Sequence, residues 1–169
     1  MKTRRARINE AAAIYQLVAH YAEQGLLLPR AEDEIRRNIS HFLVLEEKQH
    51  IVGCLSLENY GADLAEIRSI AVHPERRGEG WRASLVAFAL LEARRRGMAR
   101  IFAVTHAPQF FEPQGFVAAS RHTLTEKIER DCRACPKQQS CKLVAVVATV
   151  IPERVILPVV GETSPVPAC

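Results

Sequence analysis

The chain has 169 residues, of which 48% are apolar and 25% are charged, a composition that fits one ordinary folded domain and excludes a disordered or collagen-like chain. The net charge of +4 is spread over short basic clusters and only 6% of the residues are aromatic, so no nucleic-acid partner is expected. No apolar run approaches the roughly 18 residues of a membrane span, and polar residues follow the basic start where a signal peptide is apolar, so we expect a cytoplasmic protein with no membrane partner.

The first third of the chain predicts two helices and three strands. The predicted strands are residues 5–8, 42–46 and 51–57, and the predicted helices are residues 9–24 and 31–39. Asn9 is a candidate N-cap for the first helix, and Gly25 supplies the usual residue after a helix end. A polar turn separates the second and third strands, so they should form an antiparallel pair.

The remaining elements alternate between strands and helices. The predicted strands are residues 66–72, 100–105, 116–119 and 143–151, and the predicted helices are residues 81–96 and 108–114. Gly97 and Gly115 end the two helices. Between Arg121 and the last strand the residues are polar and predict a loop.

Three of the five cysteines crowd into a loop over residues 131–141. An odd number of cysteines disfavours a disulfide framework. Cys132, Cys135 and Cys141 have a spacing that resembles a zinc or iron–sulfur site, although tetrahedral zinc takes four ligands and this run supplies three. Free thiols are the alternative. The folded domain is expected to be residues 1–152, followed by a proline-containing tail over residues 153–169.

A glycine-containing turn joins the strand at residues 66–72 to the helix that begins at Trp81. Gly78 and Gly80 allow the backbone to approach an anion closely. Amides at a helix N-terminus add hydrogen-bond donors and the positive end of the helix dipole. Taken alone, such glycines are equally typical of an ordinary tight turn.

Residues 66–80 closely resemble the acetyl-CoA-binding core of the GNAT N-acetyltransferase superfamily. There, a strand ending in an Ala-Val-His-Pro-like run leads to a turn of the form Gln or Arg, x, x, Gly, x, then Gly or Ala; Arg77 and Gly80 match its first and fourth positions. Residues 110–116 match the family's short helix that ends in a Gly-Phe pair. The resemblance covers most of the chain and implies a single α/β domain with a mixed, mostly antiparallel sheet flanked by helices.

The resemblance also implies that acetyl-CoA is the co-substrate. The strand amides around Ile70, Ala71 and Val72 would hold the acetyl and pantetheine portion. The residues that would hold the diphosphate are Arg77, Gly78, Glu79, Gly80, Trp81 and Arg82. Arg82 departs from the family, which has Gly or Ala there, so its side chain would either add positive charge or crowd the diphosphate.

Within the superfamily, residues 24–27, residues 65–68 and the Cys-x-x-Cys-Pro-Lys segment resemble short N-acetylglutamate synthase-like enzymes. This implies acetylation of the α-amine of glutamate, at the entry to arginine synthesis. Arg30 and Arg68 would bind the acceptor by resemblance, and Arg121 is a third candidate by its place in the sequence.

Two alternatives to the glutamate assignment stay open. The protein could act on a different small amine, or it could be a catalytically silent regulator that binds acyl-CoA or a metal. The expected partner is a small-molecule amine, and a homodimer is left open.

Attack of an amine on a thioester needs a base and a donor that stabilises the oxyanion. Glu66 is the candidate base, and strand alternation puts it on one face with Arg68, Ile70 and Val72. A glutamate in this strand position resembles the general base of histone-type members of the superfamily. A salt-bridged surface pair with Arg68 is the alternative.

The other groups of the reaction are less well specified. The oxyanion donor would be a backbone amide near Ala71 or Val72. Many family members have a tyrosine that protonates the leaving thiolate, and Phe111 occupies about that position, so water or another group would take this role.

Overall fold

The computed structural model describes residues 1–76, 78, 80–135 and 141–150 of the chain. The strands in these residues are β1 (Lys2–Arg5), β2 (Phe42–Glu47), β3 (His50–Tyr60), β4 (Leu64–Val72), β5 (Arg100–Thr105), β6 (Val117–Ala119) and β7 (Val144–Thr149). The helices are α1 (Ala11–Glu23), α2 (Glu32–Arg37), α3 (Trp81–Arg95) and α4 (Thr125–Lys127), which continues into a π-helical turn over Ile128–Cys132. The 3₁₀ turns η3 (Pro74–Arg76), η4 (Pro108–Phe110) and η5 (Glu112–Gln114) lie between them. The predicted tail over residues 153–169 lies outside the described residues.

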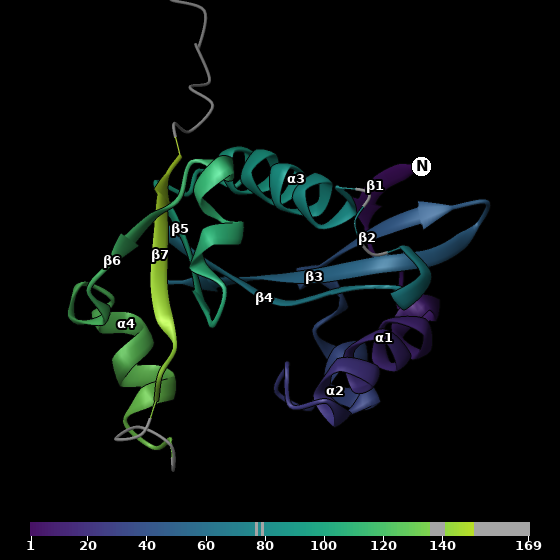
Figure 1. Cartoon of the computed structure of the whole chain (residues 1–169), viewed down its shortest axis with the longest axis horizontal. Coiled ribbons are helices and arrows are strands. Elements are labelled where there is room, and N and C mark those ends of the chain that lie inside the picture. Colours follow the sequence, from purple (N-terminus) through teal and green to yellow (C-terminus); the bar gives the residue numbers. More distant parts are fainter. Residues whose placement is uncertain (77, 79, 136–140, 151–169) are drawn as a thin grey trace, which may run out of the picture.

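All seven strands belong to one sheet, in the order β1-β2-β3-β4-β5-β7-β6. Within the described residues β4 and β5 are the one parallel pair, and the other neighbours are antiparallel. Helix α3 covers one face of the sheet, and α1 and α2 cover the other (Figure 1). The prediction of a mixed, mostly antiparallel sheet flanked by helices is therefore confirmed.

Two apolar clusters hold the helices on the sheet. On the α3 face, Leu85 and Val86 of the helix are fully buried in the larger cluster. On the opposite face, Ile14 of α1 and Ile35 of α2 are fully buried in the second cluster, together with Phe42 of β2. Burial of each large aliphatic side chain contributes roughly 1.5–3 kcal/mol, so these contacts fix both helix layers. None of the helices in the described ranges is long and apolar enough to cross a membrane.

The predicted helix ends and strand positions are largely confirmed. Gly25 and Gly97 follow α1 and α3 with φ of 70° and 74°, the left-handed conformation that glycine allows after a helix. The β2–β3 turn has two residues, Lys48 and Gln49, both with positive φ. Strand β3 is longer than predicted and runs to Tyr60. This extension adds Glu58 and Tyr60 to the strand.

The predicted first strand at residues 5–8 is wrong, because β1 lies earlier and pairs with β2. Ion pairs rather than apolar alternation hold it there: Arg4 binds Glu10 and Glu46, each at 2.6 Å. Asn9 is not the N-cap of α1 either. It lies inside a 3₁₀ turn, and the N-cap is Glu10, whose carboxylate accepts a hydrogen bond from the Arg7 amide at 2.7 Å.

The polar segment after Arg121 begins with helical turns that the sequence pattern does not predict. It contains α4 and the π-helical turn. Its sequence has no apolar stripe at helical spacing. Its buried side chains are those of Leu124 and of Lys127, which is 9% exposed. Periodicity of apolar residues could not reveal a helix that is held by charged side chains.

One extra residue interrupts β4 opposite β3. Arg68 pairs with Ser56 and Ala71 pairs with Cys54, so two residues of β4 face one residue of β3. This is a β-bulge, and Ser69 within it has a φ of 52°. A non-glycine residue rarely adopts this conformation.

The bulge reverses which side chains face each side of the sheet. Ile67, before the bulge, and Val72, after it, both pack in the α3-face cluster, whereas Ala71 packs in the α1-face cluster. Ile70 also packs against the α3-face cluster. The prediction that one face carries Glu66 together with Ile70 and Val72 is therefore wrong, because strict alternation ends at the bulge.

The bulge should be sensitive to residue type at Ser69. We expect Ser69→Gly to keep or raise the free energy of unfolding, and Ser69→Val to lower it by about 1–2 kcal/mol, because a β-branched residue tolerates positive φ least. Urea unfolding of both variants measures this. Ile70→Val, next in the strand but without positive φ, is the control; equal losses in Ser69→Val and Ile70→Val would contradict the assignment of strain to Ser69.

Candidate functional site

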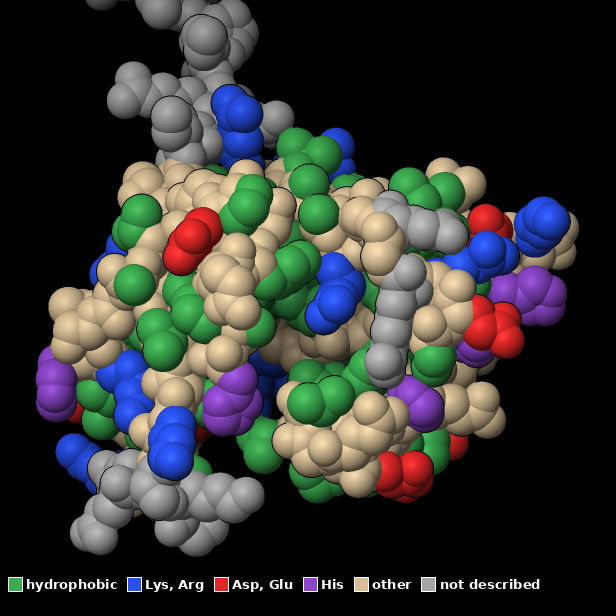
Figure 2. Space-filling view, in the orientation of Figure 1, with side chains coloured by type: hydrophobic (Ala, Val, Ile, Leu, Met, Phe, Trp, Pro, Cys, Tyr) green, Lys and Arg blue, Asp and Glu red, His purple; other side chains and the backbone are tan. Residues whose placement is uncertain are grey.

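Strands β4 and β5 pair only at their first residues and then separate. The paired residues are Leu64, Ala65 and Glu66 with Arg100, Ile101 and Phe102. Beyond these pairs β4 continues beside β3, and β5 continues beside β7. The surface in Figure 2 is hollowed near its centre, below α3 and between the two halves of the sheet. Among the described residues, the β4 edge at Ile70, Ala71 and Val72 has no strand partner on that side, so an extended ligand with amide groups can pair there.

The turn from β4 to α3 presents backbone to this opening. Gly78 and Gly80 have φ of 93° and 71°, and a Cβ added at either would meet no atom within 4 Å. Gly80 is the N-cap of α3 and offers no side chain to the first helical amides, and no acidic residue lies in the first turn. Such a helix start suits an anionic diphosphate. The predicted turn residues Arg77 and Glu79 lie outside the described residues.

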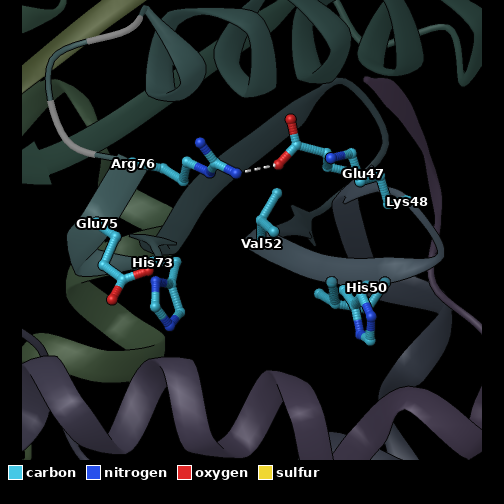
Figure 3. Close-up of a pocket in the computed structure, with 8 residues that line it drawn as sticks. Glu47, Lys48, His50, Val52, His73, Glu75 and Arg76 are labelled. Carbon is cyan, nitrogen blue, oxygen red and sulfur yellow. Dashed lines mark hydrogen bonds and ion pairs between the residues drawn. The ribbon is translucent and has the colours of Figure 1, made fainter.

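A cavity of about 400 Å³ lies on the other side of β4, next to η3. Its lining comes from the β2–β3 hairpin, including His50, and from the segment after β4, including His73 and Glu75 (Figure 3). Arg76 and Glu47 close one side of it with an ion pair of 2.6 Å. This pair ties the hairpin to η3 and thereby positions the start of the turn.

Glu66 is buried and held by residues from two distant segments. Its Oε2 accepts from the Lys127 ammonium at 2.9 Å and from the Tyr60 hydroxyl at 2.7 Å. Arg68 lies further away, with 3.7 Å between its Nε and the same oxygen. The other oxygen, Oε1, has no hydrogen-bond partner within the described part of the chain. Glu66 is therefore a buried carboxylate with several partners, and not simply a member of an exposed salt bridge with Arg68.

Asp131 extends this network. It accepts from Lys127 and from Tyr60, each at 2.6 Å. A phenol has one proton, so Tyr60 donates to either Asp131 or Glu66. Burial and the two carboxylates raise the pKa of Tyr60 well above its usual value, so it stays protonated. Burial opposes ionisation of Asp131, but the bonds from Lys127 and Tyr60 outweigh it and lower the pKa of Asp131 well below its usual value.

Glu58 of β3 joins the two predicted acceptor arginines. Arg30 donates to its Oε1 at 2.5 Å and Arg68 donates to its Oε2 at 3.1 Å. Arg130 of the π-helical turn donates to the same carboxylate at 3.0 Å, and its guanidinium carbon lies 3.5 Å from the centroid of the Tyr60 ring. The structure thus brings Arg30, Arg68 and Glu66 into one charged cluster. Arg121 is not part of it, because its guanidinium donates to the Cys141 carbonyl.

Comparison with known proteins identifies the family of this site and fold. Residues 38–118 match the model of the acetyltransferase (GNAT) domain. An uncharacterized N-acetyltransferase of Chlorobaculum tepidum is 35% identical over 146 residues, which are 86% of this chain and 94% of that protein. The chain belongs to the GNAT acetyltransferase family. It is an acetyl-CoA-dependent N-acetyltransferase, related to the amino-acid acetyltransferases.

Two further relatives concern amino acids. The amino-acid acetyltransferase of Neisseria meningitidis is 33% identical over 133 residues, which are 78% of this chain and 30% of that protein. The structure of N-acetylglutamate synthase from Neisseria gonorrhoeae, complexed with coenzyme A and N-acetyl-glutamate, superposes with a TM-score of 0.80 at 29% identity. It is matched over 88% of this chain and 35% of that protein. The present chain thus spans about a third of the length of these two relatives.

Two residues at the start of α3, Trp81 and Arg82, have side chains that contact the protein rather than an open diphosphate site. Trp81 is 7% exposed and packs in the α3-face core, so only its backbone is suited to a ligand. Arg82, where the family has a small residue, is exposed and lies over Phe110, with 5.5 Å between the guanidinium carbon and the ring centroid.

Phe111 lies where many GNAT enzymes have a tyrosine, and it is 3% exposed. Its ring contacts Phe110 and Phe116 edge-on, with centroid distances of 5.0 and 5.2 Å. Phe111 lies between η4 and η5. The prediction of a single helix over residues 108–114 is wrong, because the structure has these two 3₁₀ turns instead. The side chain has no proton to donate to a thiolate.

The described part of the cysteine segment includes the three cysteines whose spacing predicts a zinc or iron–sulfur site. In the parts of the chain with defined positions, no three His, Cys, Asp or Glu side chains are grouped to hold a metal ion. Cys132, Cys135 and Cys141 are free thiols.

The sequence pattern does not predict Tyr60 and Lys127, which bind Glu66, or Asp131, which binds both of them. The one available signal was the four-residue spacing of Lys127 and Asp131, which is typical of ion pairs on a helix. Their ammonium and carboxylate are 2.6 Å apart. Tyr60 had no comparable signal, because the predicted strand ended before it.

Glu58 should make stability depend on pH. Burial would raise its pKa, but Arg68, Arg30 and a hydrogen bond from Ser56 lower it from 4.5 to about 2. Because the pKa is lower in the folded state, the stabilisation is present above about 4.5 and is lost as pH falls toward about 2. It is worth at most about 3 kcal/mol.

We therefore expect the difference in unfolding free energy between the parent and Glu58→Gln to be largest near neutral pH and to shrink in acid. Urea unfolding across the pH range measures it. Glu126→Gln removes an exposed carboxylate of α4 and should show little difference at any pH. A Glu58→Gln deficit that stays constant down to acid pH would contradict the ion-pair assignment.

Proposed function

We propose that the protein transfers the acetyl group of acetyl-CoA to the α-amine of an amino acid, with L-glutamate as the acceptor. The observation that carries this proposal is the charged cluster around Glu66. Two of its cations come from α4 and the π-helical turn, Lys127 and Arg130, and two come from elsewhere, Arg30 and Arg68. Free amino acids carry carboxylates that such cations bind.

The arginines of the cluster differ in how accessible they are. The Arg30 side chain is 7% exposed and is held between Glu34 and Glu58. The Arg68 side chain is 24% exposed and has longer contacts, at 3.1 Å to Glu58 and 3.5 Å to Asp131. Arg68 is therefore the better placed to bind an acceptor carboxylate, and Arg30 keeps Glu58 beside it. An acidic side chain on the acceptor would exchange with the carboxylates that already occupy these cations.

Glu66 is proposed as the general base. Lys127 and Tyr60 both bind Oε2, which fixes the plane of the carboxylate and leaves Oε1 for proton transfer, directly or through water. An ammonium group loses its proton to this oxygen, and the free amine then attacks the thioester carbon. Its α-carboxylate would remain near the cations of the cluster.

The β4 edge supplies the other half of the reaction. The cofactor is proposed to lie between the separating strands, with its pantetheine along Ile70, Ala71 and Val72 and its diphosphate at the start of α3. A backbone N–H near Ala71 would donate to the oxyanion as the amine adds. Because Phe111 has no hydroxyl, we propose that, as the C–S bond breaks, water carries the second proton of the attacking nitrogen to the leaving thiolate. The role would be the first step of arginine synthesis, in the cytoplasm.

An acceptor panel tests this assignment. We expect glutamate to be acetylated with a kcat/KM at least about tenfold above those of aspartate, glutamine and lysine, since loss of a buried charged contact typically costs 1.5–3 kcal/mol. The N-acetyl product should be quantified by mass spectrometry, because exposed Cys135 would react with thiol reagents. Turnover of another amine with no acetylation of glutamate would contradict the proposal.

The base is tested by Glu66→Gln. We expect kcat to fall by about 10²–10⁴-fold while the KM for acetyl-CoA stays within twofold, and the deficit should shrink at alkaline pH as free amine accumulates. Glu126→Gln is the control for loss of a nearby carboxylate, and thermal unfolding verifies that each variant is folded. A deficit that does not change with pH would assign Glu66 to structure instead of proton transfer.

A further inference from the structure

Arg82 and Phe110 come from the two sides of the opening between β4 and β5. Arg82 is the second residue of α3, which follows β4, and Phe110 ends η4, which follows β5. Their cation–π contact of 5.5 Å therefore joins two segments that the sheet itself does not connect beyond Glu66 and Phe102. The contact lies across the side of the opening where the helix start is placed to receive a diphosphate.

The two partners are held very differently. Phe110 is part of an aromatic series with Phe111 and Phe116, which are buried in the core. The Gln114 side-chain amide also donates to the Phe110 carbonyl. Arg82 is exposed on the first turn of its helix. The ring is thus a fixed platform, and the guanidinium is the part that can move.

The charge of Arg82 has no acidic partner among the described residues. The first turn of α3 contains no acidic residue either, so the guanidinium lies beside the positive end of a helix dipole. Such an arrangement is electrostatically unfavourable until an anion is present. A planar guanidinium can bind phosphate oxygens with its edge while its face stays on an aromatic ring.

We propose that Arg82 and Phe110 form a clasp that closes over the diphosphate of bound acetyl-CoA or CoA. The guanidinium binds the diphosphate and keeps its contact with Phe110, so both sides of the opening are joined above the cofactor. The large residue where the family has Gly or Ala is then a gain in cofactor retention. The expected consequence is slow release of CoA.

The first test compares Arg82→Ala with Arg94→Ala, an equal change of charge at an exposed position near the other end of α3. We expect Arg82→Ala to raise the Kd for CoA about tenfold, mostly through faster dissociation in stopped flow, and Arg94→Ala to change it less than twofold. Unchanged or tighter CoA binding by Arg82→Ala would overturn the proposal, because Arg82 would then only crowd the diphosphate.

The second test removes the diphosphate from the ligand. S-acetylpantetheine carries the thioester without it, so Arg82→Ala should lower kcat/KM for acetyl-CoA about tenfold and leave that for S-acetylpantetheine within twofold. An equal fall with both donors would overturn the proposal, since Arg82 would then act through the fold.

The third test separates the ring from the charge. Phe110→Leu keeps the guanidinium and an apolar side chain but removes the π face, and we expect it to speed CoA dissociation about threefold, in line with the roughly 0.5–1 kcal/mol of an exposed cation–π contact. No change in CoA dissociation would overturn the clasp. Thermal unfolding of each variant confirms that it is folded.

Discussion

The extra residue in β4 at Ser69 is the constraint on which the rest of the site depends. It separates two parts of one strand that face opposite sides of the sheet: Glu66 and Arg68 face the charged cluster, whereas Ile70 and Val72 pack toward α3. The loss of pairing between β4 and β5 follows directly after Glu66. One strand can therefore present a carboxylate to the acceptor and, a few residues later, a free backbone edge to the cofactor.

Local sequence signals predicted most of the fold because they depend on single residues or short periods. Glycines after α1 and α3 have the positive φ that ends a helix, and apolar residues at helical spacing place α3 on the core. These signals failed where ion pairs replace apolar contacts. Arg4 holds β1 through Glu10 and Glu46, and charged residues hold the segment that begins at Thr125, so neither has a hydrophobic pattern to read.

The site was predictable only in the half that resembles a family motif. The prediction of Glu66 and of the cofactor turn rests on contiguous residues of that motif. Of the groups that hold Glu66, Tyr60 is six residues earlier on the neighbouring strand β3, and Lys127 is 61 residues further along the chain. The Tyr60 contact arises from the antiparallel pairing of β3 with β4, which extends to Tyr60 and Leu64. No spacing rule joins Glu66 to Lys127, because that contact arises only when the chain passes from β5 through α4 to β7.

These two halves of the site use different chemistry, and this explains the pattern of what was recognisable. The proposed cofactor half would use backbone groups at Ile70, Val72 and Gly80, whose requirements are local conformation and small residues. The acceptor half relies on side chains that neutralise one another, such as Arg68 with Glu58. Under the proposed function, substitution of these side chains would change the acceptor without altering the backbone proposed to hold acetyl-CoA. Family membership therefore follows from a short motif, whereas the acceptor depends on the arrangement of charges that only the folded chain brings together.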